Sequence, residues 1–360
     1  MVLVVNVFVW TAWCAAGCGS QDTKHQATVE PPKRVAPSGG DDETAMARQQ
    51  SAEPTVPAAG QSRRFRFIYG ADISDLPTGA KARVWLPMAV DNHHQTVQRI
   101  KIDVPAKYRE MREESFGNHL LYFEATADES GTIPLEIHYV VERREVVPHV
   151  SETSHRSERP QFLAASSLVP IDASLLKRLH GGEKPAGHAA TVARILYDTV
   201  DLHMRYDKPD GKPWGRGDAA WACDSGYGNC SDFHSLFISI CRSVGIPAKF
   251  EIGFPIPIKR GSGPVAGYHC WAKFVDRDRW LAVDISEADK HPEMKDYYFG
   301  RLTADRVLFS SGRDLKLQPP QQAGPVNFLV YPYVEVDGKR HTSLVKRFRY
   351  EDLPEATTAD

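Results

Sequence analysis

The sequence has few of the features that mark several large classes of protein. Its 360 residues include only six cysteines, and no two of them are spaced as C-x-x-C. Six cysteines are too few for a disulfide-stapled scaffold, and the absence of C-x-x-C pairs argues against a zinc site built from them. Lysine and arginine (44) nearly balance aspartate and glutamate (46), and no segment carries a concentrated basic run. Because binding through phosphate neutralisation needs a basic face, we expect no nucleic-acid partner.

The remaining composition is ordinary for a soluble globular protein. Hydrophobic residues make up 42% of the chain and charged residues 25%, both close to average usage. At roughly 150 residues per domain, the length favours two domains. Six cysteines are few enough for each to be assigned separately: Cys14, Cys18, Cys223, Cys230, Cys241 and Cys270.

The N-terminus has the character of an export signal. Residues 1–17 are almost wholly apolar, too short to span a bilayer comfortably, and end in small residues before Cys18. This pattern predicts a signal peptide at 1–18. The run Ala15-Ala16-Gly17-Cys18 resembles a bacterial lipobox, which implies that Cys18 is lipidated and anchors the mature protein to a membrane of the cell envelope. The alternatives are a generic signal peptide, which would leave the protein periplasmic, or a buried apolar segment.

Residues 19–62 lack the means to fold on their own. No aromatic residue occurs between Ser20 and Ser62, and Pro, Gln, Ser, Ala and Gly are frequent. Such a segment buries too little apolar area to offset its ordering entropy. We therefore expect a disordered tether between the anchor and the folded part.

Residues 63–150 have the pattern of a β-sandwich. Short runs of alternating apolar and polar residues are separated by Gly, Asp and Pro turns, which predicts antiparallel strands. The runs lie at 65–69, 82–86, 97–104, 119–125 and 135–146. The polar residues that follow indicate an interdomain linker over 151–187.

After residue 187 the spacing of the apolar residues changes from the alternation of strands to the spacing of helices. Helical spacing predicts helices over 189–204 and 230–244, the second ended by Gly245 and Pro247. Strand patterns follow at 248–254, 268–275 and 280–285. We expect an α+β core at 188–320, with helices packed on an antiparallel sheet. Asp337-Gly338 between the runs 328–336 and 344–350 predicts a β-hairpin extension at 321–360.

Cys230 lies at the start of the second helix, behind the loop Asp224-Ser225-Gly226-Tyr227-Gly228-Asn229. A thiol at a helix N-terminus faces unpaired N–H groups and the positive end of the helix dipole, and both favour the thiolate. The backbone N–H of Cys230 can also serve as one donor to an oxyanion. The position alone is equally compatible with a small buried hydrophobe.

Strand parity pairs a histidine with an aspartate. If the turn 276–279 is centred between Arg277 and Asp278, facing residues of the two strands have numbers that sum to 555. His269 then faces Ser286, and Asp284 lies on the same face two residues along, within reach of one hydrogen bond. Cys270 has the opposite parity and is expected in the core. A surface polar pair is the alternative for His269 and Asp284.

Cys230, His269 and Asp284 have the residue types of a thiol triad: a nucleophile, a base and a carboxylate that orients the base. The motifs that carry them, Gly228-Asn229-Cys230-Ser231-Asp232-Phe233-His234, Tyr268-His269-Cys270-Trp271-Ala272 and Val283-Asp284, resemble the core of the bacterial transglutaminase-like superfamily. The resemblance covers residues 197–314. It implies a papain-like core, often preceded by a β-sandwich, and acyl transfer or hydrolysis on peptide or glutamine amides through a cysteine thioester, without a cofactor. The implied partner is a protein or peptide substrate.

Departures from the family leave alternatives open. Ser231-Asp232 follows the cysteine where animal transglutaminases have an aromatic residue, and no calcium-binding pattern occurs, so peptidase or amidase activity competes with crosslinking. A second oxyanion donor could come from Trp221 or Trp214. An inactive binding module at the cell surface is the non-enzymatic alternative, and a zinc site made by the same three residue types is another.

The other candidates have more than one interpretation. Cys223 could form a redox-sensitive pair with Cys230 or be a plain loop residue, and Cys241 is expected in the core. His234, one turn beyond Cys230, could touch the site, or could be a capping or surface histidine.

Overall fold

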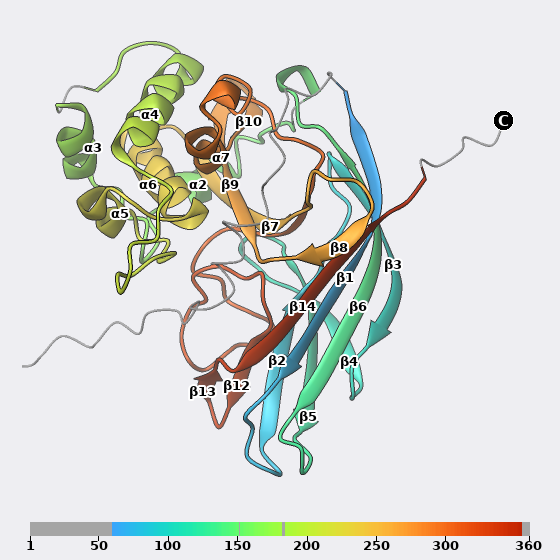
Figure 1. Ribbon diagram of the computed structural model, residues 1–360. Helices are drawn as coiled ribbons and strands as arrows, with labels where there is room; N and C mark the ends of the chain where they lie inside the picture. Colours follow the sequence, from blue (N-terminus) through green and yellow to red (C-terminus); the bar gives the residue numbers. More distant parts are fainter. Residues whose placement is uncertain (1–59, 151, 182–183, 355–360) are drawn as a thin grey trace, which may run out of the picture. The chain divides into compact units, whose positions relative to one another are not determined.

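The computed structural model describes residues 60–150, 152–181 and 184–354 (Figure 1). It contains three antiparallel sheets and a group of helices, which confirms the expected α+β class. The predicted signal, the Cys18 lipidation site and residues 19–59 of the predicted tether lie outside the described residues. Strand β1 begins at Ser62, the last residue of the predicted tether.

Two five-stranded sheets form the β-sandwich. The first has the order β3-β6-β1-β14-β8 and the second β13-β12-β2-β5-β4. Alternation explains why these segments are strands: in β1, Phe65, Phe67 and Tyr69 are buried between more exposed neighbours. The strands of the first sheet are β1 (Ser62–Ile73), β3 (Gln95–Asp103), β6 (Ile133–Arg144), β8 (Ser262–Val265) and β14 (Leu344–Asp352). Those of the second are β2 (Lys81–Pro87), β4 (Tyr108–Arg112), β5 (His119–Thr126), β12 (Tyr333–Val336) and β13 (Lys339–His341).

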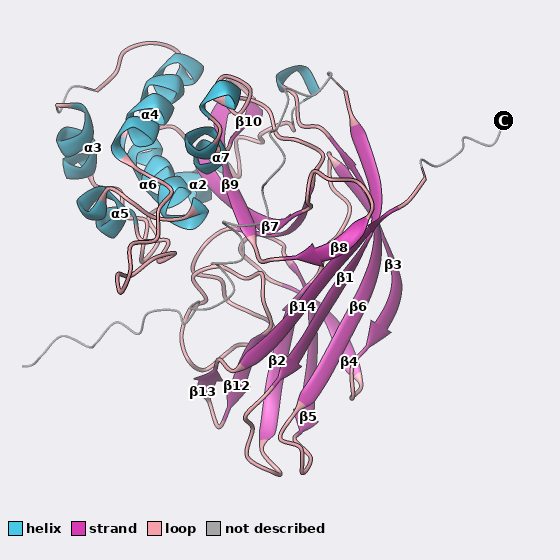
Figure 2. Cartoon of the chain, in the orientation of Figure 1, coloured by secondary structure: helices cyan, strands magenta, loops and turns pink. Residues whose placement is uncertain are grey.

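A four-stranded sheet and the helices form the core that was expected after residue 187. The strand order is β10-β9-β7-β11, and helices gather on one side of this sheet (Figure 2). The strands are β7 (Ala248–Pro255), β9 (His269–Asp276), β10 (Arg279–Val283) and β11 (Arg306–Ser311). The helices are α2 (Arg159–Leu163), α3 (Ala173–His180), α4 (Ala189–His203), α5 (Ala219–Ser225), α6 (Cys230–Ser243) and α7 (Ile285–Lys290), with 3-10 turns η1 (Pro148–Val150) and η2 (Pro292–Met294).

Helix α6 is buried along its length and packs against β9 and β7. Phe237 of α6 meets Phe274 of β9 with ring centroids 6.3 Å apart. Gly245 follows the helix with a φ of 84°, a left-handed conformation that glycine adopts without a steric cost. The helix and its end match the prediction from spacing.

The segments on either side of the core differ from the sequence interpretation. Residues 151–187 hold α2 and α3, and this stretch packs on α6: Arg242 Nη1 donates to the Ala164 carbonyl at 2.8 Å. It is therefore part of the core's packing and not a free linker, because its helices bury apolar side chains such as Phe162 and Leu175.

The C-terminal strands do not form a separate extension. The Asp337-Gly338 turn joins β12 to the short β13, whereas β14 pairs with β1 in the other sheet. The expected pairing of 328–336 with 344–350 is thus wrong, and strands from 321–360 complete both sheets of the sandwich. Long-range pairing with β1 and β2 overrides the local hairpin signal.

One continuous hydrophobic cluster joins the sandwich to the core. At the junction, the Phe254 ring of β7 lies 5.0 Å from Phe67 of β1 and 4.4 Å from Phe348 of β14. The chain itself also crosses between the two parts. After β7 it leaves the core sheet and forms β8, which pairs with β14 of the sandwich, and it then returns to the core sheet as β9. In the part of the chain that the structure describes, no helix is both long and apolar enough to cross a membrane.

Candidate active site

Cys230 is the first residue of α6, and a tight network defines this helix start. The Asn229 side chain accepts a hydrogen bond from Ser231 N at 2.8 Å, and Asp232 Oδ2 accepts one from Asn229 N at 3.0 Å. This is the reciprocal arrangement of a capping box. Asp232 also accepts from Gly215 N and Gly217 N, at 2.9 and 2.7 Å, so the loop before α5 is fastened to the turn that carries the thiol.

Gly228 is required for the close approach of this turn. A Cβ at that position would lie 2.5 Å from the Asp232 side chain, a distance that real Cβ contacts do not show. Any other residue would push Asp232 away from the backbone groups that it holds.

His269 and Asp284 meet, as parity predicts. The expected position of Ser286 opposite His269 is wrong, because β10 ends at Val283 and Ser286 lies in α7. Strands β9 and β10 pair in the register Arg279↔Asp276, so facing residues sum to 555. The His269 Nε2–H donates to Asp284 Oδ2 at 2.7 Å. Asp284 lies one residue beyond β10, at the N-cap of α7, where its Oδ1 accepts from Glu287 N at 3.2 Å. The aspartate therefore both starts a helix and orients the imidazole.

The side chains of Cys230, His269 and Asp284 come together at the edge between α6 and β9. His269 interacts with the Cys230 thiol through a hydrogen bond and through its charge, and it binds Asp284 through Nε2. All three residues are buried, and Cys230 and Asp284 have no exposed surface. The structure thus brings together the three residues that the sequence selected.

Arg306 is a site residue that the sequence did not indicate. It is buried at the start of β11, and its Nη1 donates to Asp284 Oδ2 at 3.0 Å. Its guanidinium also lies 4.9 Å from the centre of the Trp271 ring. No local pattern could have identified it, because β11 and Asp284 meet only through the sheet.

His234 is buried and joins two elements of the site. Ile285 N donates to its Nε2 at 3.1 Å, so the other nitrogen, Nδ1, carries the proton and donates to the Cys230 carbonyl at 2.7 Å. Burial lowers the pKa of His234 to about 4, which keeps the ring neutral. Of the two sequence alternatives for His234, contact with the site is the one observed.

The electrostatic environment favours a thiolate–imidazolium pair. Burial by itself would raise the pKa of Cys230, but hydrogen bonds from Cys270 and His269 and the positive charge of His269 lower it to about 5. Burial would likewise lower the pKa of His269, whereas the charge and hydrogen bond of Asp284 raise it to about 9. Burial opposes ionisation of Asp284 too, yet His269 and Arg306 hold its pKa well below the ordinary range.

Cys270 is buried, as expected, but it is not remote from the chemistry. Its parity turns it toward α6, where its Sγ lies 3.7 Å from His234 Nδ1 and its thiol forms a hydrogen bond with Cys230. Parity correctly separated Cys270 from His269. It could not show that the helix carrying Cys230 lies on the Cys270 side of the sheet.

The two tryptophans considered as oxyanion donors have different surroundings. Trp221 lies in α5. The centre of its ring is 5.5 Å from that of Tyr227, and the guanidinium carbon of Arg216 lies over the ring, 5.6 Å from its centre. Trp214 precedes Gly215, which is bonded to Asp232, and its buried Nε1 has no hydrogen-bond partner among the described residues. A buried donor without a partner makes Trp214 the stronger candidate.

A cavity of about 600 Å³ opens beside the triad. His269 and Arg306 line it, together with the segment 255–264 and Tyr350 of the sandwich strand β14. Cys230 does not line this cavity and is fully buried. Among residues 60–150, 152–181 and 184–354, no group of three or more His, Cys, Asp or Glu side chains is placed to hold a metal ion.

A family model and one superposed structure support the same fold. Residues 174–285 match the family model of the transglutaminase-like superfamily. A structure from Cytophaga hutchinsonii, described as a candidate cysteine protease, superposes with a TM-score of 0.50 at 13% identity, over 82% of this chain and all of that one. The periplasmic domain of TgpA from Pseudomonas aeruginosa gives a TM-score of 0.35 at 15% identity, over 68% of this chain and 98% of that one.

One sequence relative is an uncharacterized protein of Haemophilus influenzae. It is 30% identical over an alignment of length 156, and the match covers 34% of this chain and 42% of the relative. The match thus spans less than half of that protein. Together, the family match and the superposition establish a transglutaminase-like fold, as the sequence motifs predicted.

Proposed function

We propose that this protein is a cysteine-dependent acyltransferase or hydrolase that acts on peptide or glutamine amides. The observation that carries the proposal is the hydrogen-bonded series Cys230, His269 and Asp284, with the thiol at a helix start and the histidine oriented by the carboxylate. This arrangement supplies a nucleophile, a proton carrier and an orienting group.

The proposed reaction has two halves. The Cys230 thiolate attacks the amide carbonyl carbon, and the oxyanion accepts hydrogen bonds from the Cys230 N–H and from a second donor, for which Trp214 is the better candidate. His269 gives its proton to the departing amine as the C–N bond breaks, which leaves a thioester. Water or a second amine then attacks the thioester, His269 takes up the proton of the attacking group, and the thiolate is released.

The surroundings of the triad support a peptide as substrate. The cavity beside His269 has room for a side chain or a short stretch of chain, and Pro, Ile and Tyr side chains supply much of its wall. Cys230 is covered in this conformation, so the proposed reaction needs a local movement that opens the thiol. That burial is the observation that favours the alternative, an inactive binding module.

Export remains part of the proposal. The apolar N-terminus and the lipobox-like Cys18 support a protein of the cell envelope, anchored through a lipid or released into the periplasm. Hydrolysis of proteins or peptides outside the cytoplasm would suit that location.

A peptide-library assay with and without a primary amine tests the activity. We expect the wild type to release amine products, and Cys230→Ala to lose at least about 1,000-fold in rate, because removal of a covalent nucleophile leaves only binding and oxyanion stabilisation. Incorporation of the added amine would identify a transferase, and its absence a hydrolase. The matched control is Cys223→Ala, which removes a buried thiol outside the triad and should keep the wild-type rate.

Equal turnover by the wild type and Cys230→Ala would refute the proposal. Absence of turnover together with a Cys230 that resists alkylation would support the binding module instead.

A further inference from the structure

We propose that Cys230 and Cys270 form a redox modification site: a hydroperoxide oxidises the two thiols to a disulfide, and the disulfide switches the candidate active site off. Both residues are free thiols in the structure, and both are fully buried. The switching rests on the proposed function, because it requires Cys230 to be the nucleophile. Formation of the disulfide is independent of any catalytic activity.

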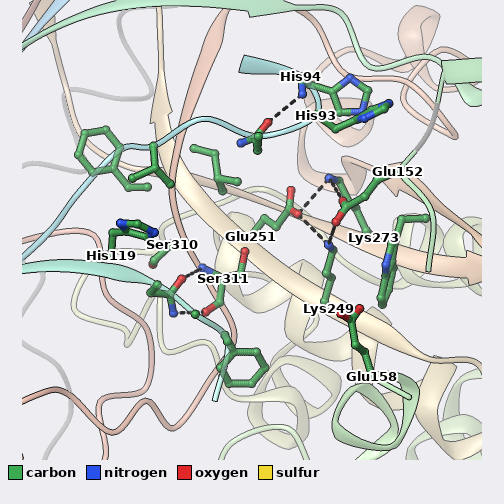
Figure 3. A pocket seen from close by; sticks show the side chains of 18 of the residues that line it. His93, His94, His119, Glu152, Glu158, Lys249, Glu251, Lys273, Ser310 and Ser311 are labelled. Atoms are coloured by element: carbon green, nitrogen blue, oxygen red, sulfur yellow. Dashed lines mark hydrogen bonds and ion pairs between the residues drawn. The ribbon is translucent and has the colours of Figure 1, made fainter. Parts of the chain in front are cut away.

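Strand β9 has two faces with different surroundings. Lys273 lies on the face directed away from α6 and meets Glu152 and Glu251 at 3.2 Å and 3.0 Å. Figure 3 shows this face, where Lys273 and Lys249 point at the two glutamates beside a cavity of about 400 Å³. None of the described residues that line this cavity is a cysteine. Cys270 has the opposite parity, so its thiol is on the face that packs against α6.

Two contacts place Cys270 beside the first turn of α6. Its Sγ lies 3.7 Å from Nδ1 of His234, and the same nitrogen donates to the Cys230 carbonyl at 2.7 Å. Cys230 and His234 are one turn apart, so their side chains lie on the same side of the helix. The Cys270 thiol and backbone N–H both form hydrogen bonds with the Cys230 sulfur. The two sulfurs are therefore neighbours before any oxidation, and a disulfide would shorten their separation to about 2.05 Å.

The other two described cysteines are not placed to pair with Cys230. Cys241 lies about three turns later on α6, roughly 16 Å along the helix axis. Cys223 lies in α5, and the charged groups that act on its thiol belong to α3, the cap of α3 and α5 itself. The fold thus brings Cys270 to Cys230, in place of the Cys223 partner that the sequence suggested.

The two thiols differ in reactivity. Burial would raise the pKa of Cys230, but hydrogen bonds from Cys270 and His269 lower it to about 5, so Cys230 is the thiolate that attacks an oxidant. Burial raises the pKa of Cys270 well above its ordinary value. Cys270 therefore remains a thiol until Cys230 has been oxidised, which gives each residue a separate role in the pair.

The oxidation consists of two steps. The Cys230 thiolate attacks one oxygen of hydrogen peroxide, the O–O bond breaks, and the departing hydroxide takes the His269 proton to become water. Cys230 is then a sulfenic acid. The Cys270 sulfur attacks the Cys230 sulfur, the S–O bond breaks, and the hydroxide leaves with the Cys270 proton as a second water. The two sulfurs are oxidised, the two peroxide oxygens are reduced, and the product has no thiolate for acyl transfer.

Peptide mapping without reduction tests the pair in the full-length protein. After treatment with hydrogen peroxide we expect a cross-link between the tryptic peptides 217–242 and 261–273. The second peptide contains Cys270 as its only cysteine, and the first contains Cys223, Cys230 and Cys241. The cross-link should therefore be lost in Cys230→Ala and should persist in the matched controls Cys223→Ala and Cys241→Ala.

Alkylation by iodoacetamide at pH 6 measures the consequence for the site. In the oxidised wild type, Cys230 should be alkylated at least about tenfold more slowly than in the reduced protein, and dithiothreitol should restore the rate. In Cys270→Ser, peroxide should carry Cys230 on to sulfinic and sulfonic acid, which dithiothreitol does not reduce. Thermal unfolding shows whether this variant is folded, and the cross-link map of the wild type does not depend on it.

Three results would overturn the inference: oxidation of wild-type Cys230 to sulfinic acid without a cross-link, a cross-link to Cys270 that survives in Cys230→Ala, or a Cys230 that peroxide leaves unmodified. The two proposals fail separately. A disulfide in a protein without turnover would refute the proposed function alone, whereas turnover in a protein that forms no disulfide would refute this inference alone.

Discussion

The reactivity of Cys230 depends on a few neighbouring groups that lower its pKa, whereas burial would raise it. A fully buried thiol would normally resist ionisation, since burial disfavours the charged form. Here the imidazolium of His269 and the Cys270 thiol both hydrogen-bond to it, and the helix start adds a favourable dipole. The consequence is a thiolate that exists well below the pH at which an ordinary cysteine ionises.

We expect iodoacetamide to modify Cys230 with a rate that rises through about pH 5 and then stays level. The pKa of Cys230 is lowered to about 5, so the thiolate is lost only as the pH falls through that value. The pKa of His269 is raised to about 9, so catalytic turnover should fall above pH 9, where the general acid has lost its proton, although alkylation continues. Labelled peptides identified by mass spectrometry give the rates.

The control for this experiment is Cys223, whose pKa burial raises. It should remain unmodified at pH 6. In His269→Ala the midpoint for Cys230 should move upward, to about 8.5 or above. A wild-type Cys230 that reacts only above pH 8 would contradict the ion pair.

At the scale of secondary-structure elements, the N-terminus of α6 determines where the Cys230 thiol lies. Asn229 caps the helix through Ser231 N and also donates from its side chain to the Tyr268 hydroxyl at 2.9 Å. Tyr268 is the neighbour of His269 in the chain, so one side chain connects the helix start to the strand that carries the histidine. The cap therefore affects geometry as well as stability.

We expect Asn229→Ala to lower the free energy of unfolding by about 1–2 kcal/mol, the usual effect of losing an N-cap. It should also slow the alkylation of Cys230 at pH 6, because the thiol and His269 lose their common support. Urea unfolding and the labelling assay measure the two effects.

The matched variant is Asp172→Ala. Asp172 caps α3 by accepting from Ser174 N at 2.8 Å, so its loss should cost a similar amount of stability and leave the reactivity of Cys230 unchanged. If both variants slowed alkylation equally, the special role of the α6 cap would be disproved.

At the scale of the whole molecule, the sandwich and the core share one hydrophobic cluster. Strand β14 lies between β1 and β8, and its Phe348 touches aromatic rings of both parts: Phe67, Tyr69, Phe254 and Tyr331. Tyr350 of the same strand lines the cavity beside His269. The sandwich therefore contributes to the wall of the candidate active site.

We expect Phe348→Ala to cost about 3–5 kcal/mol of stability, the range for truncation of a buried aromatic residue. Unfolding followed by far-UV circular dichroism and by tryptophan fluorescence should shift together, because the cluster couples the two parts. Val345→Ala, at a 52% exposed position of the same strand, should be nearly neutral. Separate transitions for the two probes would mean that the parts unfold independently.

Much of this protein follows from short-range patterns. The period of apolar residues marks helices and strands, Asn229 and Gly245 mark the ends of α6, and the length of one turn sets the register that pairs His269 with Asp284. Each of these depends on residues a few positions apart, whose geometry the backbone imposes directly. The transglutaminase-like fold was predicted in another way, from the resemblance of the three motifs around Cys230, His269 and Asp284 to that superfamily.

The tertiary structure alone decided what distant segments do together. Arg306 reaches Asp284, Cys270 lies on the side of the sheet that faces α6, and β14 pairs with β1 in place of the local hairpin. These outcomes depend on which buried surfaces and which charged groups meet. A one-dimensional pattern does not contain that information, because the free energy of such contacts comes from packing and desolvation across the whole fold.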